Sequence, residues 1–288
     1  MEPRDIRLPG SDGLSLHALE WSTDGVPMIL IHGFGNEAHI WDDFAPRVAD
    51  AYRVVAIDLR GHGDSDHDPE HRYDYTNHIA DLEAITAHLG VERMVLVAHS
   101  LGGRVSMLYA GLHPEQIAGL VIVDSAPELD ARGTTRIRME VAEHQAPVFA
   151  NVSEYETVLA HNYPAATPEA IKRMAKNGLR QRDDGKYELK MDLAYRGKDG
   201  PQLSPDEMAS REEEHKKNMW AALEKLEAPT LVVRGAASDI MSPEVADKMA
   251  EEVLQNGTLA IVGQAGHSVM TDNPEGFAEA VCKFALGE

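Results

Sequence analysis

The stretch that decides the fold is Val95–Gly103, V-L-V-A-H-S-L-G-G. Its first residues are apolar without alternation, which is typical of a strand buried on both faces, and Arg104–Leu112 then repeats with a helical period near 3.6. Ser100 lies at the joint. A serine in such a turn is a candidate nucleophile when the residues two before and two after it are small, because strand and helix crowd the turn. Here they are Ala98 and Gly102, and alone they also fit an ordinary strand-to-helix turn.

Composition sets the class of protein. A chain of 288 residues with 43% hydrophobic and 26% charged residues is typical of a globular protein with one large core and an insertion. Its 27 basic against 48 acidic residues give a net charge of −21, which disfavours nucleic acid and anionic membrane surfaces as partners. The single cysteine, Cys282, excludes an internal disulfide. No apolar run is long enough to span a bilayer or to act as a signal peptide, so we expect a cytoplasmic protein.

Apolar runs alternate with helical patterns along most of the chain. Turn formers at 9–13 predict an opening hairpin at a sheet edge. The pattern over Tyr75–Leu89 predicts an amphipathic helix, with Thr76 as a possible N-cap. Ser242 is expected to cap a helix over 243–254. Repeated strand–helix units predict a mostly parallel eight-stranded sheet with helices on both faces. The expected strands are 4–8, 14–21, 28–31, 54–57, 94–98, 117–123, 230–234 and 258–262.

The pattern of apolar and charged residues changes between the sixth and seventh expected strands. Residues 128–227 lose the apolar strand runs and become helix-like and charged, with enough scattered apolar residues to bury a surface of their own. We therefore expect a core formed by 1–127 and 228–288, and a mainly helical cap over 128–227. A hairpin or exposed loop is expected at Asp183–Lys186 within that cap.

Polar residues follow the expected strands, and the carboxyl ends of parallel strands meet at one rim of a sheet. Ser100 needs a base to take its proton, and imidazole has a suitable pKa. His267, after the last strand, is the candidate base. His99 is adjacent to the serine and points elsewhere, so packing or pocket lining is the expected role.

The imidazole needs a carboxylate on its other nitrogen. Asp239 and Asp124 both follow strands and both keep the order Ser…Asp…His, so order does not decide between them. Asp239 is preferred, with Asp124 as the alternative acid.

A tetrahedral intermediate needs donors for its oxyanion. The backbone N–H groups of Phe34, in a glycine-rich loop, and Leu101, at the start of a helix, are the candidates. The loop 58–66 carries charges that are expected to pair with one another, and the spacing of its His and Asp residues does not predict a metal site.

Together these motifs resemble the α/β-hydrolase superfamily, in its serine-nucleophile branch. His32–Gly35 is similar to the family's H-G-x-G oxyanion loop, Asp58–Ser65 to its D-x-R-G-x-G-x-S loop and Ala98–Gly103 to its nucleophile elbow. Asp239 matches its usual acid and Gly266-His267 its histidine. Ala98 departs from the pattern. Some similar members use an acid at the position of Asp124.

The resemblance implies an α/β-hydrolase fold with an inserted helical cap, and hydrolysis of a small-molecule carboxylic ester through an acyl-enzyme on Ser100, without a cofactor or metal. A serine nucleophile disfavours dehalogenase and epoxide hydrolase activity. Lactone hydrolysis, C–C bond hydrolysis, cofactor-free haloperoxidase activity and, from another class, a non-catalytic ligand-binding protein remain alternatives. Gly33, Trp41 and His99 are expected in the substrate pocket. Acyl and alcohol specificity and oligomeric state are left open.

Overall fold

The computed structural model describes residues 2–143, 147–196 and 204–287. Eight strands form one sheet in the order β1-β2-β4-β3-β5-β6-β10-β11. Only β2 runs antiparallel to its neighbours, so the expected mostly parallel sheet with a hairpin at one edge is confirmed. The strands are β1 (Arg4–Pro9), β2 (Ser15–Glu20), β3 (Val26–Ile31), β4 (Tyr52–Ile57), β5 (Met94–His99), β6 (Ile117–Val123), β10 (Thr230–Gly235) and β11 (Gly257–Val262).

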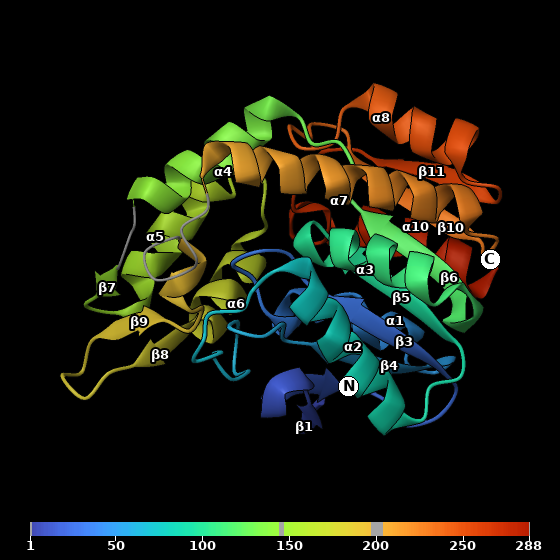
Figure 1. Cartoon of the computed structure of the whole chain (residues 1–288). Coiled ribbons are helices and arrows are strands. Elements are labelled where there is room, and N and C mark those ends of the chain that lie inside the picture. The colour runs from blue at the N-terminus through green and yellow to red at the C-terminus, as the bar shows by residue number, and fades with distance from the viewer. Residues whose placement is uncertain (1, 144–146, 197–203, 288) are drawn as a thin grey trace.

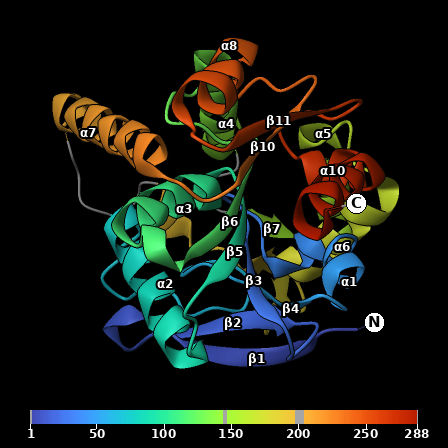
Figure 2. The ribbon, with the colours of Figure 1, turned by 90° about the vertical axis from the view of Figure 1, so that its right-hand side faces the viewer.

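Helices cover both faces of this sheet. Figure 2 shows α2 and α3 on one side of the strands, and α1 and α10 on the other. Within the described residues, no helix is both long and apolar enough to cross a membrane. The helices outside the β6–β10 connection are α1 (Ala45–Val48), α2 (Tyr75–Leu89), α3 (Leu101–Leu112), α8 (Pro243–Asp247), the π-helix Lys248–Val253, α9 (Val269–Asp272) and α10 (Pro274–Leu286); short 3₁₀ turns are Ser11–Gly13, Ala38–Trp41 and Pro114–Gln116.

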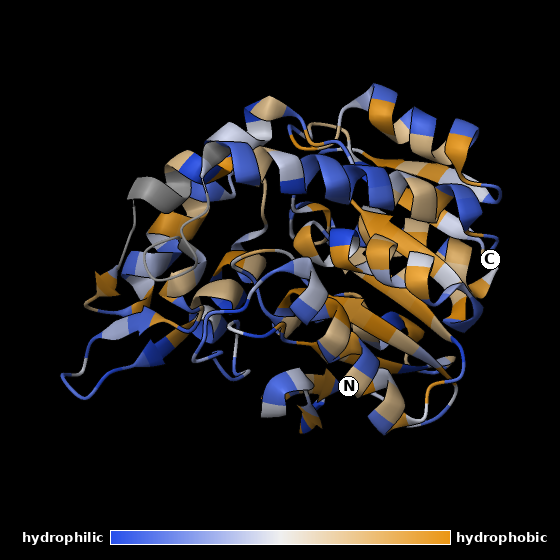
Figure 3. Ribbon diagram, in the orientation of Figure 1, coloured by the Kyte–Doolittle hydropathy of each residue, from blue (hydrophilic) through white to orange (hydrophobic). Residues whose placement is uncertain are grey.

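The core lies in two layers, one on each face of the sheet. Successive side chains of a strand point to opposite faces, and in β5 Leu96 and Ala98 pack beneath α2 and α3 while Val95 and Val97 pack beneath α1 and α10. Both sets are apolar because both faces are covered, which explains the unbroken apolar runs in the sequence. The central strands are accordingly the most hydrophobic part of the ribbon (Figure 3).

Helix ends follow from capping residues. The helix at Tyr75–Leu89 has the expected bounds, but Asp74, not Thr76, is its N-cap: the Asp74 carboxylate accepts the N–H of Asn77. The prediction of Thr76 was wrong because Asp74 stands immediately before the first helical residue and caps at least as well. Ser242 caps α8 as expected. The expected single helix over 243–254 changes to a π-helix at Lys248.

The connection from β6 to β10 contributes no strand to the large sheet in its described residues. It lies beside the carboxyl ends of the strands, to the left in Figure 1, while α7 returns along α3. A hairpin closes at Asp183–Lys186 as expected, through the N–H of Arg182 and the C=O of Lys186. The elements are α4 (Ala131–Glu143), β7 (Val148–Phe149), α5 (Val152–Asn162), α6 (Pro168–Gly178), β8 (Leu179–Gln181), β9 (Tyr187–Leu189), the 3₁₀ turn Leu193–Arg196 and α7 (Pro205–Lys225).

Tyr195 anchors this connection to the core. Its ring stacks on Tyr73 with centroids 4.1 Å apart, and its hydroxyl donates to the C=O of Arg60 at 3.1 Å and lies 3.0 Å from Nε2 of His78. Gly61 has a φ of +68°, and a Cβ there would lie 2.9 Å from the Tyr195 ring. Only glycine allows both that backbone conformation and this close approach.

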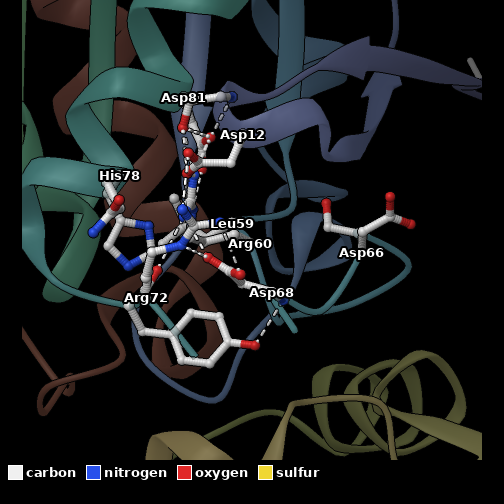
Figure 4. A network of polar contacts seen from close by, with 12 residues as sticks. Asp12, Leu59, Arg60, Asp66, Asp68, Arg72, His78 and Asp81 are labelled. Atoms are coloured by element: carbon white, nitrogen blue, oxygen red, sulfur yellow. Dashed lines mark hydrogen bonds and ion pairs between the residues drawn. The ribbon is translucent and has the colours of Figure 1, made fainter. Parts of the chain in front are cut away.

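Arg60 joins three segments of the core (Figure 4). Its guanidinium, fully buried, donates to both carboxylate oxygens of Asp81 at 2.6 and 2.7 Å, to Asp68 at 3.2 Å and to Oγ of Ser11 at 2.6 Å. The loop after β4 is thereby tied to α2 and to the turn after β1. The charges of the loop 58–66 were expected to pair with one another, and this is corrected for Arg60: its partners Asp81 and Asp68 lie outside the loop, because α2 packs alongside it.

We expect Arg60→Ala to lower the free energy of unfolding by about 3–5 kcal/mol, because the buried carboxylate of Asp81 loses its charged partner. Urea unfolding at pH 7 measures the loss. Arg72→Ala is the matched control: Arg72 also pairs with Asp68, but its side chain is 35% exposed, so a far smaller loss is expected. Equal losses for the two variants would contradict a special role for Arg60.

Candidate active site

Ser100 occupies the turn between β5 and α3 with φ +51° and ψ −114°. A non-glycine residue in this region is strained by about 1–3 kcal/mol, and it persists only where the surroundings enforce it. Here the neighbours are packed too closely for larger side chains: a Cβ on Gly33 would lie 2.9 Å from Cβ of Ser100, and one on Gly102 2.6 Å from the C=O of His32. Ala98 is accommodated inside the helix-covered core.

The loops after β5, β6 and β11 bring three side chains into one hydrogen-bonded chain. Nε2 of His267 lies 3.0 Å from Oγ of Ser100, and its Nδ1 lies 2.8 Å from Oδ2 of Asp124. An imidazole held in this way has Nδ1–H directed at the carboxylate and Nε2 free to accept a proton from the serine. The structure thus brings together Ser100, His267 and the alternative acid.

Asp124 follows β6 directly and is completely buried. Besides His267, its carboxylate accepts the hydroxyl of Ser238 at 2.6 Å and the N–H of Gly235 at 3.2 Å, both from the end of β10. Ser238 in turn accepts the N–H groups of the two residues after Asp239. These bonds hold the carboxylate in one orientation.

The preferred pairing of Asp239 with His267 is corrected by the structure. Both carboxylate oxygens of Asp239 are bonded to Arg136 of α4, at 2.7 and 2.9 Å, and this pairing holds the pKa of Asp239 below its usual range. The physical reason lies in the preceding residue: Ser238 turns inward onto Asp124, and Asp239 faces α4. Its C=O also accepts the N–H of Gly133.

Asp239→Asn is therefore expected to lower kcat by less than about tenfold while raising KM, because it loosens α4 over the site without touching His267. Steady-state kinetics with a p-nitrophenyl ester measure both constants. Arg136→Gln should have a similar effect, since it breaks the same ion pair from the other side. If Asp239→Asn lowered kcat as much as Asp124→Asn does, Asp239 would have to be the carboxylate that assists His267.

Two backbone amides next to this site have no partner among the described residues: Leu101 follows Ser100, and Phe34 follows Gly33, which packs against Ser100. Within the described part of the chain, neither the N–H of Phe34 nor that of Leu101 donates to another protein group. Leu101 is also the first residue of α3, where the helix dipole favours negative charge. Both amides are thus available to an anionic oxygen.

Two buried histidines brace the loop that carries Phe34. Nε2 of His32 accepts the N–H of Leu59, so its Nδ1 carries the proton and donates to the C=O of Gly33 at 2.7 Å. Nε2 of His62 accepts the N–H of Gly35 at 3.1 Å. Burial lowers the pKa of both rings, which keeps them neutral. The bond from His32 to the C=O of Gly33 fixes the orientation of the peptide group whose N–H belongs to Phe34.

The three residues expected in the pocket have different positions. His99 lines the cavity, and its Nε2–H donates to the C=O of His267 at 2.9 Å. Gly33 is not among the described residues that line the cavity: it packs against Ser100 and His99, and its neighbour Phe34 lines the cavity instead. The expected place of Trp41 in the pocket is corrected: its side chain is fully buried against Phe277, with ring centroids 5.9 Å apart, because the 3₁₀ turn Ala38–Trp41 directs it into the core beneath α10.

A cavity of about 950 Å³ opens beside Ser100 and His267, at the upper end of the usual range for small-molecule sites. One wall comes from the loops after the strands of the large sheet. The opposite wall comes from the β6–β10 connection, and is largely apolar: Ile137, Phe149, Val158, Leu159 and Met191. The arrangement suits a small ligand with apolar parts whose reacting group lies at Ser100.

The family model for the alpha/beta hydrolase fold matches residues 26–274. The chain belongs to this family. Its match covers every strand of the sheet from β3 to β11, together with Ser100, Asp124 and His267.

Relatives of this α/β-hydrolase are similar over nearly their full lengths. A 2-(acetamidomethylene)succinate hydrolase of Mesorhizobium japonicum is 25% identical over 90% of this chain and 88% of its own length. An esterase of Mycobacterium tuberculosis is 24% identical over 93% and 85%. The crystal structure of an alpha/beta hydrolase from Novosphingobium aromaticivorans has a TM-score of 0.81 at 29% identity, covering 98% and 97%. These relatives support a hydrolase activity for this chain.

The described residues of this hydrolase include one cluster compact enough for a metal ion, His17, Asp58 and Asp64. Its atoms are already bonded to each other: Nδ1 of His17 lies 2.8 Å from Oδ2 of Asp58, which also accepts the N–H of Asp64. The cluster therefore acts as a hydrogen-bonded brace. The expectation of a metal-free protein stays a prediction.

Sequence reasoning missed Ser238, His32 and His62 as supports of the site. The role of Ser238 could have been suspected from the sequence, because it stands next to the candidate acid Asp239 and its hydroxyl can bond to another carboxylate. The two histidines stand inside the recognised loops, but only the fold shows which peptide groups they hold.

Proposed function

We propose that this α/β-hydrolase is a serine hydrolase that cleaves carboxylic esters through an acyl-enzyme on Ser100. The single observation that carries the proposal is the hydrogen-bonded chain from Ser100 through His267 to Asp124 at the floor of the cavity. A serine, an imidazole and a buried carboxylate in this order activate the serine for acyl transfer. The esterase among the relatives supports the same chemistry.

Each of the three hydrogen-bonded side chains has a role in the proposed reaction. Oγ of Ser100 bonds to the ester carbonyl carbon as its proton passes to Nε2 of His267, and the carbonyl oxygen becomes an oxyanion that the Phe34 and Leu101 amides stabilise. The C–O bond then breaks, and Nε2 returns the proton to the departing alcohol. Water repeats the two steps on the acyl-enzyme, which releases the acid and restores the Ser100 hydroxyl.

We propose that residues 128–227 act as a cap that selects the substrate, while the core, 1–127 and 228–288, performs the chemistry. Two contacts support this division: Phe149 and Met191 of the connection form cavity walls, and the Asp239–Arg136 pair joins α4 to the core beside the site. Cap contacts of this kind set access and specificity in enzymes with lids.

Hydrolysis of p-nitrophenyl acetate, butyrate and octanoate tests the ester proposal, together with labelling of Ser100 by a fluorophosphonate followed by peptide mass spectrometry. Turnover of at least one ester and stoichiometric labelling of Ser100 are expected. Labelling without ester turnover would favour another acyl substrate, such as a lactone or a C–C bond substrate. Neither turnover nor labelling would favour a non-catalytic binding protein.

A further inference from the structure

The N–H groups of Phe34 and Leu101 each belong to a peptide group that is hydrogen-bonded on its opposite, carbonyl side. The C=O of one residue and the N–H of the next lie in one planar trans unit and point in opposite directions. The C=O of Gly33 accepts Nδ1–H of His32 at 2.7 Å and the N–H of Asn36 at 3.2 Å. These two bonds hold the peptide group whose N–H belongs to Phe34.

The peptide group that carries the N–H of Leu101 has the same arrangement. The C=O of Ser100 accepts the N–H of Arg104 at 3.1 Å, in the first turn of α3, and Oγ of Ser125 donates to it at 2.7 Å. The Ser125 hydroxyl is thus the counterpart of the His32 ring. Each carbonyl accepts one backbone donor and one side-chain donor, and such bonds polarise a peptide group and strengthen its N–H as a donor.

The position of Ser125 is enforced by the surrounding core. Ser125 is fully buried, and it follows Asp124, whose φ of +44° is uncommon for a residue other than glycine. A Cβ on Gly103 would lie 2.7 Å from Oγ and 2.6 Å from Cβ of Ser125, so only glycine leaves space for this side chain. The nucleophile-elbow pattern accounts for Gly102 but not for Gly103, and the contact with Ser125 gives a reason for the second glycine.

We propose that Ser125 is a positioning residue for the oxyanion, because its hydroxyl fixes and polarises the peptide group that directs the N–H of Leu101 at the substrate carbonyl oxygen. Ser125 is not among the described residues that line the cavity, so it acts through this peptide group. The inference rests on the proposed ester hydrolysis. Since the charge on the oxygen develops in the transition state, the contribution of Ser125 belongs to kcat and not to KM.

The test replaces Ser125 by alanine and measures kcat and KM with the best substrate among the p-nitrophenyl acetate, butyrate and octanoate esters. Removal of an oxyanion donor lowers kcat about 10²–10³-fold; Ser125→Ala leaves the Leu101 N–H in place but held less firmly, so we expect about a tenfold loss of kcat and a change in KM of less than about twofold. Circular dichroism shows whether the variant is folded. If it is not, Ser125→Cys, which keeps a weaker donor, should lower kcat by about threefold.

Ser106→Ala is the matched control. Ser106 is also fully buried, and it lies on α3, but its hydroxyl has no hydrogen-bond partner among the described residues. This variant loses a buried serine hydroxyl without touching the peptide group of Leu101, so kcat should stay within about twofold of the native value.

A trifluoromethyl ketone with the hydrocarbon chain of the best ester isolates the oxyanion. Ser100 adds to its carbonyl carbon, the serine proton passes to His267, and the ketone oxygen becomes anionic beside the N–H of Leu101. We expect Ser125→Ala to weaken inhibition by this ketone about tenfold. Inhibition by the corresponding trifluoromethyl alcohol, which has no carbonyl group, should change by less than about twofold.

The pH profile of kcat/KM tests whether Ser125 acts instead through its neighbour Asp124. The acid limb of this profile reports the pairing of His267 with Asp124, so a displaced carboxylate would shift it. We expect the acid limbs of Ser125→Ala and of the native protein to coincide. A shifted limb would overturn the inference and make Ser125 a support of the acid.

Equal kcat values for Ser125→Ala and Ser106→Ala would also overturn the inference, as would equal losses of inhibition by the ketone and the alcohol. If the native protein cleaves an ester and these results follow, only this inference fails. If fluorophosphonate labels Ser100 but no ester is cleaved, the labelling rate replaces kcat in the comparison of the two variants. If the native protein shows neither turnover nor labelling, the proposed function fails and this inference fails with it.

Discussion

Replacing Asp124 by asparagine is expected to lower kcat for ester hydrolysis by about 10⁴-fold, the loss that follows when an imidazole of this kind is held in the wrong tautomer. Oδ2 of Asp124 accepts both Nδ1–H of His267 and the hydroxyl of Ser238, and Oδ1 accepts the N–H of Gly235. An asparagine NH₂ at the Oδ1 position would meet the Gly235 donor. The favoured orientation puts NH₂ toward His267, which forces the ring proton onto Nε2, where it blocks transfer from Ser100.

The measurement is kcat with saturating p-nitrophenyl ester, together with circular dichroism to show that the variant is folded. Ser238→Ala is the matched control: it removes a hydrogen bond from the same carboxylate but leaves its charge and its contact with His267, so we expect a loss of less than about 100-fold. A folded Asp124→Asn variant that keeps more than a tenth of the native kcat would contradict the assignment of Asp124 as the acid.

Ser100→Ala should lower kcat by about 10⁶-fold and abolish labelling by fluorophosphonate, because no other group supplies the nucleophile. A residual acceleration of about 10³–10⁴ over water is expected from the Phe34 and Leu101 amides and from binding in the cavity. Rate measurements need protein free of native enzyme, so labelling with radioactive phosphonate should accompany them.

The fold should survive this change. Alanine at position 100 has the same φ as serine, and the lost hydroxyl makes one hydrogen bond, to His267. The free energy of unfolding is therefore expected to change by about 1 kcal/mol or less. A few per cent of native activity, after contaminating enzyme has been excluded, would indicate a different nucleophile.

Much of this architecture could be predicted from local patterns. A strand over 94–98 is predicted because its residues are apolar on both faces, and the rim where Ser100 and His267 meet follows from the parallel order of strands. These inferences depend on neighbours in sequence or on a rule of topology. The Asp74 cap was missed only because two possible capping residues stand close together.

The partners of Asp239 and Trp41 could not be predicted in the same way. Asp239 is drawn to Arg136, about a hundred residues earlier in the chain, and no sequence pattern places α4 over the loop after β10. Trp41 follows a glycine-rich loop that lines the cavity, but one 3₁₀ turn directs its ring into the core. Such outcomes depend on long-range packing, which residue order does not encode locally.

The hydrogen bond between Ser238 and Asp124 has an engineering consequence. Asp124 follows β6 and Ser238 follows β10, so both residues belong to the core and their contact involves no residue of 128–227. The acid would keep its position if a different insertion, long or short, were grafted between β6 and β10. We therefore expect that residues 128–227, proposed above to select the substrate, can be exchanged while Ser100, His267 and Asp124 keep their positions.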